Sequence, residues 1–132
     1  MKINHIGMVV SDLEKSEAFY RDNFGYSVKV KTLHVQNQDV IITMLSNPLG
    51  GADIELITPV SEKSPSQNAL RKRLVLNHIC YETKKYDELL IKYNAKIVRP
   101  SMPAPVELFG GGRTFFAYLD GALFEFLELL NE

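Results

Sequence analysis

Asn77-His78-Ile79-Cys80-Tyr81-Glu82 stands in the middle of the 132-residue chain, and its first three letters repeat Asn4-His5-Ile6 near the start. Each copy begins an apolar run of strand type, and each run is followed by a polar segment with helical periodicity. The two histidines lie a little over half the chain apart. An internal repeat of this kind is typical of a chain that contains the same structural unit twice. The repeat predicts a chain built from two similar modules.

A second repeated feature places one glutamate inside an apolar strand in each half. Ile54-Glu55-Leu56 and Phe124-Glu125-Phe126 follow the histidine of their half at nearly equal distances along the chain. Neighbouring residues of a strand point to opposite faces, so each glutamate faces away from its apolar neighbours. A carboxylate that faces a packed core is costly unless it is paired or bound to a metal.

The repeated histidines and glutamates form a candidate metal site. Imidazole and carboxylate groups are ligands for zinc, nickel, cobalt, iron and manganese ions. The simpler interpretation of each residue alone is structural, because antiparallel strands often have one wet face and a lone histidine is often hydrogen-bonded within the fold. The repeated order of histidine and glutamate favours the metal. The four candidate ligands are His5, Glu55, His78 and Glu125.

Periodicity and turn residues predict the same α+β order, β-α-β-β-β, in both halves. In the first half, strands are expected over 3–10, 26–35, 40–45 and 52–58, with a helix over 12–24 that Gly25 ends. In the second half, strands are expected over 75–81, 96–99, 113–119 and 123–129, with a helix over 84–93. Proline and glycine at high density predict an irregular loop over 100–112. We expect one domain over 1–132, with modules 1–60 and 75–132 and a connector 61–74 that is helical from Ser66 to Leu74.

Composition excludes several classes of function. Hydrophobic residues make up 45% of the chain, which predicts a packed core. The net charge of −1 gives no electrostatic reason to expect binding to nucleic acid or to a membrane. A single cysteine excludes an intrachain disulfide. Without an apolar segment near Met1 of the signal-peptide type, the expected location is the cytoplasm.

Several segments together resemble one superfamily over nearly the whole chain. The opening His5-Ile6-Gly7-Met8-Val9-Val10-Ser11-Asp12-Leu13 resembles that of vicinal oxygen chelate proteins, the glyoxalase/bleomycin resistance/dioxygenase superfamily. Further segments that fit are Phe19-Tyr20-Arg21-Asp22, Phe24-Gly25, Ile54-Glu55-Leu56, Asn77-His78-Ile79-Cys80-Tyr81-Glu82 and Gly121-Ala122-Leu123-Phe124-Glu125-Phe126. The branch with glyoxalase I and methylmalonyl-CoA epimerase is the most similar. The resemblance implies a curved, mainly antiparallel sheet around a central cup.

The resemblance also implies a site in that cup. A divalent ion (zinc, nickel, cobalt, manganese or iron) would be held by His5, Glu55, His78 and Glu125. Epimerases of this branch use a further carboxylate base on the strand before the second ligand, where this chain has Ile42. Ile42 therefore argues against a two-base mechanism and is compatible with a one-base mechanism, in which Glu55 or Glu125 moves a proton at a carbon next to a metal-polarised carbonyl.

Three functions compete. The first is a metal-dependent lyase or isomerase of glyoxalase or epimerase type that acts on a small molecule. The second is a non-catalytic protein that binds an antibiotic or metabolite, which Ile42 favours. The third is an extradiol-type dioxygenase, which Glu55 disfavours because such enzymes leave that position without a ligand. The resemblance further implies a homodimer.

Several other residues have less specific roles. The expected apolar wall of the site consists of Met44, Met102, Phe109, Phe115 and Tyr118. Cys80 either lines the site or is a small buried apolar residue. Gly110-Gly111-Gly112-Arg113 is either a lid or anion contact, or a loop of little fixed structure. His34 is expected to be exposed.

Overall fold

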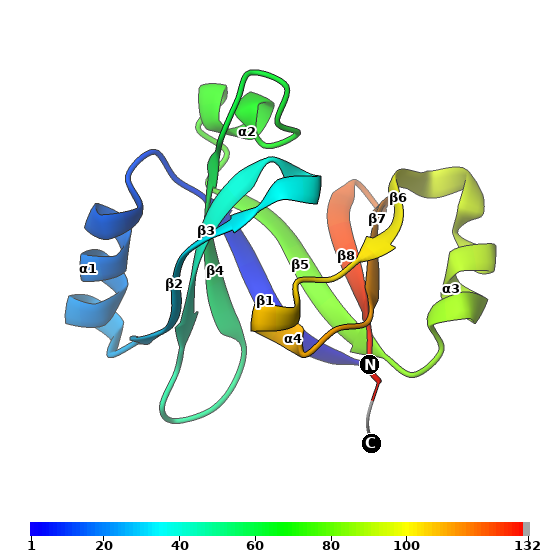
Figure 1. The fold of residues 1–132 in the computed structure, drawn as a ribbon, viewed down its shortest axis with the longest axis horizontal. Helices are drawn as coiled ribbons and strands as arrows, with labels where there is room; N and C mark the ends of the chain where they lie inside the picture. Colours follow the sequence, from blue (N-terminus) through cyan, green and yellow to red (C-terminus); the bar gives the residue numbers. More distant parts are fainter. Residues whose placement is uncertain (131–132) are drawn as a thin grey trace. The chain divides into compact units, whose positions relative to one another are not determined.

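The computed structural model describes residues 1–130, which form eight β-strands, four α-helices and two short 3-10 helices (Figure 1). The first half contains β1 (Lys2–Val9), α1 (Leu13–Phe24), β2 (Ser27–Val35), η1 (Gln36–Gln38), β3 (Val40–Ser46), β4 (Asp53–Pro59) and α2 (Gln67–Arg71). The second half contains β5 (Leu76–Thr83), α3 (Tyr86–Lys92), η2 (Asn94–Lys96), β6 (Ile97–Pro103), α4 (Val106–Phe109), β7 (Arg113–Leu119) and β8 (Ala122–Glu128).

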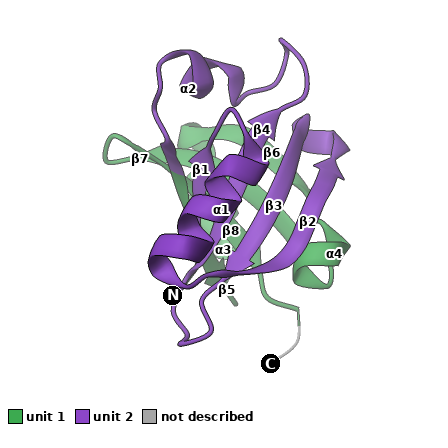
Figure 2. Cartoon of the chain, turned by 90° about the vertical axis from the view of Figure 1, so that its left-hand side faces the viewer, with its two compact units in different colours: residues 1–4, 78–132 green, residues 5–77 purple. Residues whose placement is uncertain are grey.

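The chain divides into two compact units, which Figure 2 colours separately. Unit 2 is residues 5–77, and its strands are hydrogen-bonded in the order β2-β3-β4-β1. Unit 1 is residues 1–4 with the chain from His78 onward, and its strands follow the equivalent order β5-β8-β7-β6. In each unit the first strand pairs in parallel with the last, and the other pairs are antiparallel. The predicted α+β class with two β-α-β-β-β modules is confirmed; the single domain over 1–132 stays a prediction.

In unit 2, the helix α1 covers one face of the strands (Figure 2). Asp12 caps its first turn by accepting a hydrogen bond from the Lys15 backbone N–H at 3.1 Å. Gly25 ends it in a left-handed conformation with a φ of 76°, as the sequence predicts. The core beneath the helix is built on Leu45, Ile54 and Leu56, with Met8, Val10, Leu13, Tyr20 and Tyr26 packed around them. This packing leaves the opposite face of the strands to His5 and Glu55.

In unit 1, the helix α3 covers the equivalent face. Tyr86 and Leu89 of α3 pack with Phe115, Ala117 and Phe126 of the sheet. The rings of Phe115 and Phe126 are 5.2 Å apart, and Tyr86 meets Phe115 edge-on at 5.3 Å. These aromatic contacts use the alternate residues of β7 and β8, so the other alternate set lies on the opposite face.

The predicted irregular loop over 100–112 is wrong. The strand β6 continues to Pro103, and the helix α4 follows, ending at Gly110 with a φ of 75°. Pro100 is compatible with a strand here because β6 is the edge strand of the order, and its pairing with β7 shifts register between Arg99 and Met102. The connector helix is also shorter than expected, spanning Gln67–Arg71.

The helices found within residues 1–130 include none with the length and apolar character that a bilayer crossing requires.

Candidate functional site

His5 and Glu55 form a buried pair in unit 2. Both residues project from neighbouring parallel strands, and Gly7 of β1 is the register partner of Glu55 on β4. The glycine adds no side chain beside the carboxylate. His5 Nε2 lies 3.6 Å from Glu55 Oε2, and the two residues are 0% and 7% exposed. The first histidine and the first glutamate of the repeat are therefore brought together.

The rest of that face is hydrocarbon. On β3, Met44 is the register partner of Glu55 and Ile42 is the partner of Ile57, so Met44 and Ile42 share the face of the carboxylate. Ile42 and Met44 are each 2% exposed. At the position where the resemblance implies a second base, this chain therefore has the alkyl side chain of Ile42, which cannot move a proton. Met44, an expected wall residue, lies on this face.

His78 and Glu125 form the equivalent pair in unit 1. His78 lies on β5, and Glu125 lies on the adjacent parallel strand β8. His78 Nε2 is 3.1 Å from Glu125 Oε1, and the residues are 4% and 3% exposed. The sequence repeat thus becomes a structural repeat, because each unit encloses one imidazole beside one carboxylate.

Glu125 has a second partner that sequence reasoning missed. Thr114 of β7 is fully buried, and its hydroxyl donates to Glu125 Oε2 at 2.7 Å. The same hydroxyl oxygen lies 3.1 Å from the carbonyl oxygen of Phe126. Each carboxylate oxygen of Glu125 therefore contacts a polar group, one the imidazole and the other the hydroxyl. This arrangement fixes the orientation of the carboxylate.

Sequence reasoning also missed Phe116, which lies on this face in place of the expected wall residue Phe115. Phe116 is the register partner of Glu125, and its ring meets the His78 ring edge-on with centroids 5.3 Å apart. Phe115 points to the opposite face and packs beneath α3, so its expected place in the wall is wrong. The two-residue turn at Asp120-Gly121 pairs Leu119 with Ala122. Counting back from that turn in the sequence would have identified Phe116.

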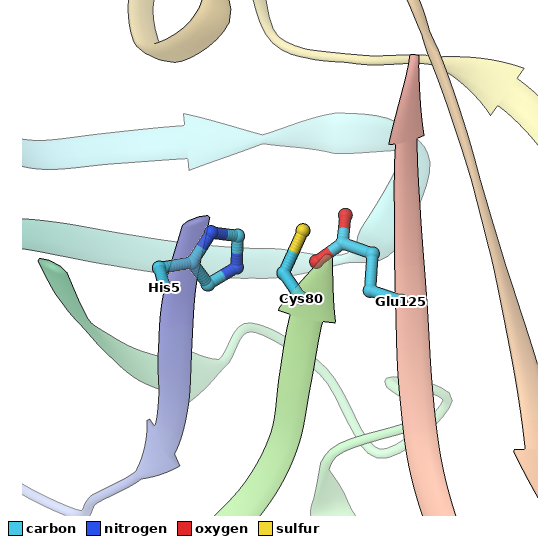
Figure 3. Close-up of side chains that lie close together, drawn as sticks. All are labelled: His5, Cys80 and Glu125. Carbon is cyan, nitrogen blue, oxygen red and sulfur yellow. The ribbon is translucent and has the colours of Figure 1, made fainter. Parts of the chain in front are cut away.

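Cys80 lies on the same face of unit 1 as Glu125. It is the register partner of Glu125, and Figure 3 shows both side chains on the neighbouring strands β5 and β8, with His5 drawn on β1. Cys80 is 0% exposed and packs with Ala104 and Leu127, against which Phe109 also lies. Phe109, an expected wall residue, therefore lies beside this face. Met102 is the partner of Thr114 and shares the face, whereas Tyr118 is 54% exposed.

The glycine-rich segment has a structural explanation. Gly112 has a φ of 88°, and a Cβ atom there would lie 2.8 Å from the backbone oxygen of Glu128. Arg113 binds Glu128 with an Nη2–Oε2 distance of 2.6 Å and Asp87 at 3.1 Å, and its guanidinium stacks over the Tyr86 ring. The hydrogen bond from Arg113 holds the pKa of the Glu128 carboxyl below its usual range. Arg113 thus ties the end of β8 to α3. His34 is exposed, as expected.

The donor sets of the two pairs fit a divalent ion. Two ligand atoms about 2.1 Å from a tetrahedral ion lie roughly 3.4 Å from one another. The nitrogen-to-oxygen distances of 3.6 Å in the His5 pair and 3.1 Å in the His78 pair are close to this value. Imidazole nitrogen and carboxylate oxygen are also the donors that zinc, nickel, cobalt, manganese and iron accept. Each pair can therefore supply two ligands.

Comparisons with known proteins identify the relatives of this chain. The model of the family described as Glyoxalase/Bleomycin resistance protein/Dioxygenase superfamily matches residues 4–118. Mitochondrial methylmalonyl-CoA epimerase of Mus musculus is 28% identical over 100 residues, which is 74% of this chain and 54% of the mouse protein. The chain thus spans about half the length of that curated relative.

Solved structures share the fold. The crystal structure of methylmalonyl-CoA epimerase from Mycobacterium tuberculosis superposes with a TM-score of 0.83 at 20% identity, covering 98% of this chain and 89% of that one. A variant of the Streptomyces coelicolor methylmalonyl-CoA epimerase in complex with 2-nitronate-propionyl-CoA gives a TM-score of 0.77 at 23% identity, covering 98% and 94%.

Proposed function

The chain belongs to the Glyoxalase/Bleomycin resistance protein/Dioxygenase superfamily, and from this premise we propose that it is a metal-dependent isomerase of acyl thioesters. The proposed reaction moves a proton at the carbon next to the thioester carbonyl. The observation that carries the proposal is the duplicated buried pair of histidine and glutamate. The relatives named methylmalonyl-CoA epimerase support the thioester as substrate.

The proposed metal ligands are His5, Glu55, His78 and Glu125. An ion of the zinc class takes three or four protein ligands, whereas each pair offers two. We therefore propose that both pairs bind one ion. A bound divalent ion would supply Lewis acidity that polarises the substrate carbonyl and lowers the energy of negative charge developing on its oxygen.

Glu125 is the proposed base. Its Oε1 faces His78 and its Oε2 accepts from Thr114, so the buried carboxylate is held in one orientation. A carboxylate that is fixed and shielded from water can take a proton from carbon and return it. Glu55 is the alternative base, with the imidazole of His5 at 3.6 Å. On β3, the position of Ile42 on this face offers no third candidate base, because its side chain is a hydrocarbon.

Hydrogen exchange tests the proposal. Metal-loaded protein is incubated with methylmalonyl-CoA in D2O, and deuterium at the carbon next to the thioester is measured by mass spectrometry. The wild type should exchange this hydrogen, Glu125→Gln should not, and the exposed control Glu88→Gln on α3 should match the wild type. If the Glu125→Gln variant still exchanges this hydrogen for deuterium, Glu125 is not the base.

One observation favours a second function. The alkyl side chain of Ile42 is buried on the face of Glu55, where a second acid–base group is expected for an epimerase. A protein that binds an acyl thioester or similar metabolite without turnover would have no need of that group. This function predicts saturable binding of methylmalonyl-CoA by the wild type without any deuterium exchange.

The homodimer and the cytoplasmic location stay predictions. Light scattering after size-exclusion chromatography tests the dimer, and about 30 kDa is expected for two copies of a chain of 15.0 kDa.

A further inference from the structure

Unit 1 has a second concave region on the face of its strands opposite Glu125. On the neighbouring strands β5 and β8, Tyr81 is the register partner of Phe126, and Cys80 is the partner of Glu125. Because successive residues of a strand point to opposite faces, Tyr81 and Phe126 lie on the face that α3 covers. The helix α3 has only seven residues, and two cavities lie beside it, each lined by residues of unit 1 alone.

The larger cavity combines an apolar lining with basic residues. Its volume is about 810 Å³, which is within the range of pockets that hold small molecules. Leu89 of α3 and Leu129, which follows β8, supply apolar surface. Its charged lining residues are three lysines and one glutamate, namely Lys2, Lys84, Lys85 and Glu82. This combination suits a ligand with an apolar part and a negative charge.

The basic residues of this cavity are exposed, and their charges outnumber that of Glu82. The Thr83 hydroxyl accepts a hydrogen bond from the Lys85 backbone N–H at 2.9 Å, which fixes the backbone from which this lysine extends. Lys2 Nζ lies 4.0 Å from Glu82 Oε1, and the Lys2 side chain is 81% exposed. Lys84 is also exposed. Lysine side chains are long and flexible, so their ammonium groups can move to meet an anion.

The smaller cavity is lined mainly by aromatic side chains. Its volume is about 350 Å³. Tyr93 and Phe126, two of its lining residues, stack with ring centroids 5.7 Å apart, and the rings of Tyr81 and Phe124 lie 6.1 Å apart. The lining residues described for this cavity include no charged side chain. Covering this apolar surface with a hydrocarbon chain would be favourable in water.

The two cavities are neighbours along α3, and Met1 lines both. Leu89 lines the larger cavity and Tyr93 the smaller one, and the Tyr93 backbone N–H donates to the Leu89 carbonyl oxygen at 2.9 Å, one helical turn away. On β5, Thr83 lines the larger cavity and Tyr81 the smaller one, two residues apart on one face. We call the two cavities together the α3 groove. The groove is basic where α3 begins and aromatic where α3 ends.

We propose that the α3 groove binds a free fatty acid of medium chain length. The carboxylate lies at the lysines, and the alkyl chain follows α3 to the aromatic side chains. An ammonium group donates charge-assisted hydrogen bonds to a carboxylate, and the alkyl chain removes apolar surface from water. The groove lies on the face opposite Glu125, so binding there needs neither the metal nor the proposed reaction.

Three probes test the charge and the chain separately. Decanoate, decylamine and butyrate are titrated by calorimetry into the whole 132-residue chain at concentrations that form no micelles. A chelator is present, so that no carboxylate binds an ion at the histidines. The double variant Lys84→Gln/Lys85→Gln removes two lysines of the α3 groove. The matched control Lys63→Gln/Lys72→Gln removes two exposed lysines of unit 2.

Decanoate should bind saturably to the wild type. Decylamine should bind about tenfold more weakly or less, because its ammonium group meets like charges, and so should butyrate, because it buries less apolar surface. The groove variant should weaken decanoate binding about fivefold or more, as expected for the loss of two exposed charge contacts, and the control should match the wild type. Equal affinity for decanoate and decylamine, or equal weakening in both double variants, would overturn the proposal.

NMR spectra of the backbone amides locate the ligand. Decanoate should shift the amide signals of Thr83, Leu89 and Tyr93 and leave those of Ile42 and Met44 unchanged. Shifts centred on Ile42 and Met44 would place decanoate on the face of Glu55 and would refute binding in the α3 groove.

Discussion

Replacing Thr114 with valine tests how the carboxylate of Glu125 is held. Valine has nearly the shape of threonine, so Thr114→Val removes the hydroxyl with little change in packing. The lost contact is the hydrogen bond from Thr114 Oγ1 to Glu125 Oε2 at 2.7 Å, between residues that are 0% and 3% exposed. The backbone oxygen of Phe126 also loses a neighbour at 3.1 Å.

The size of the effect follows from the burial of both groups. A hydrogen bond to a charged group contributes about 1.5–3 kcal/mol, and a buried acceptor that loses its donor cannot turn to water instead. We therefore expect the metal-free variant to lose about 1.5–3 kcal/mol of unfolding free energy. For a chain of this length that corresponds to a Tm lower by roughly 5–12 °C. Loss of the contact that orients a ligand should also weaken metal binding by about 10-fold or more.

Urea denaturation of metal-free protein measures the stability, and competition with a chromophoric chelator measures the zinc affinity. Thr43→Val is the matched control. Thr43 is buried on β3, where its hydroxyl accepts a hydrogen bond from the Thr32 backbone N–H at 3.2 Å, so this variant should lose stability and retain zinc affinity. A Thr114→Val variant that unfolds like the wild type and binds zinc equally well would show that this hydroxyl does not hold Glu125.

Two further predictions concern the end of β8. Arg113 holds the pKa of Glu128 below the ordinary 4.5, so the carboxylate stabilises the fold fully above pH 4.5 and this contribution is lost as the pH falls through the folded-state pKa. Glu128→Gln should therefore lower the unfolding free energy at pH 7. In urea titrations, the unfolding free energy of this variant should decrease less steeply below pH 4.5 than that of the wild type, and an equally steep decrease would contradict the pairing. Gly112→Ala should cost about 2–4 kcal/mol in thermal unfolding, because strain at a φ of 88° adds to a contact of 2.8 Å with the Glu128 oxygen. Gly25→Ala, which has the strain at a φ of 76° without such a contact, should cost about 1 kcal/mol, and equal losses for the two variants would refute the role of the contact.

The sequence was sufficient for the modules and for each pair of candidate ligands. The repeated Asn-His-Ile and the two glutamates predict one set of four ligands, and the structure places the histidine and glutamate of each half 3.6 and 3.1 Å apart. This succeeded because strand alternation fixes the face of a side chain, and because the first and last strands of each module are hydrogen-bonded neighbours. The hydrophobic pattern is a local property of the sequence, so the strands and helices of each module can be predicted without knowledge of the full fold.

The remaining errors arise from contacts between strands that are distant in sequence. Proline density predicted a loop over 100–112, but a register shift in β6 accommodates Pro100, and α4 forms within the same segment. The predicted wall contained Phe115, whereas its neighbour Phe116 meets His78. Whether Phe115 or Phe116 shares the face of Glu125 depends on the register of β7 with β8, for which the short Asp120-Gly121 turn is the local signal.

Metal content measured by mass spectrometry on untagged protein tests the central proposal that both pairs bind one ion. About one divalent ion per chain is expected, and His5→Ala and His78→Ala should each lower the metal content, because each variant removes one of the four ligands of the same ion. No bound ion after reconstitution, two ions per chain, or loss in only one of the two variants would contradict it.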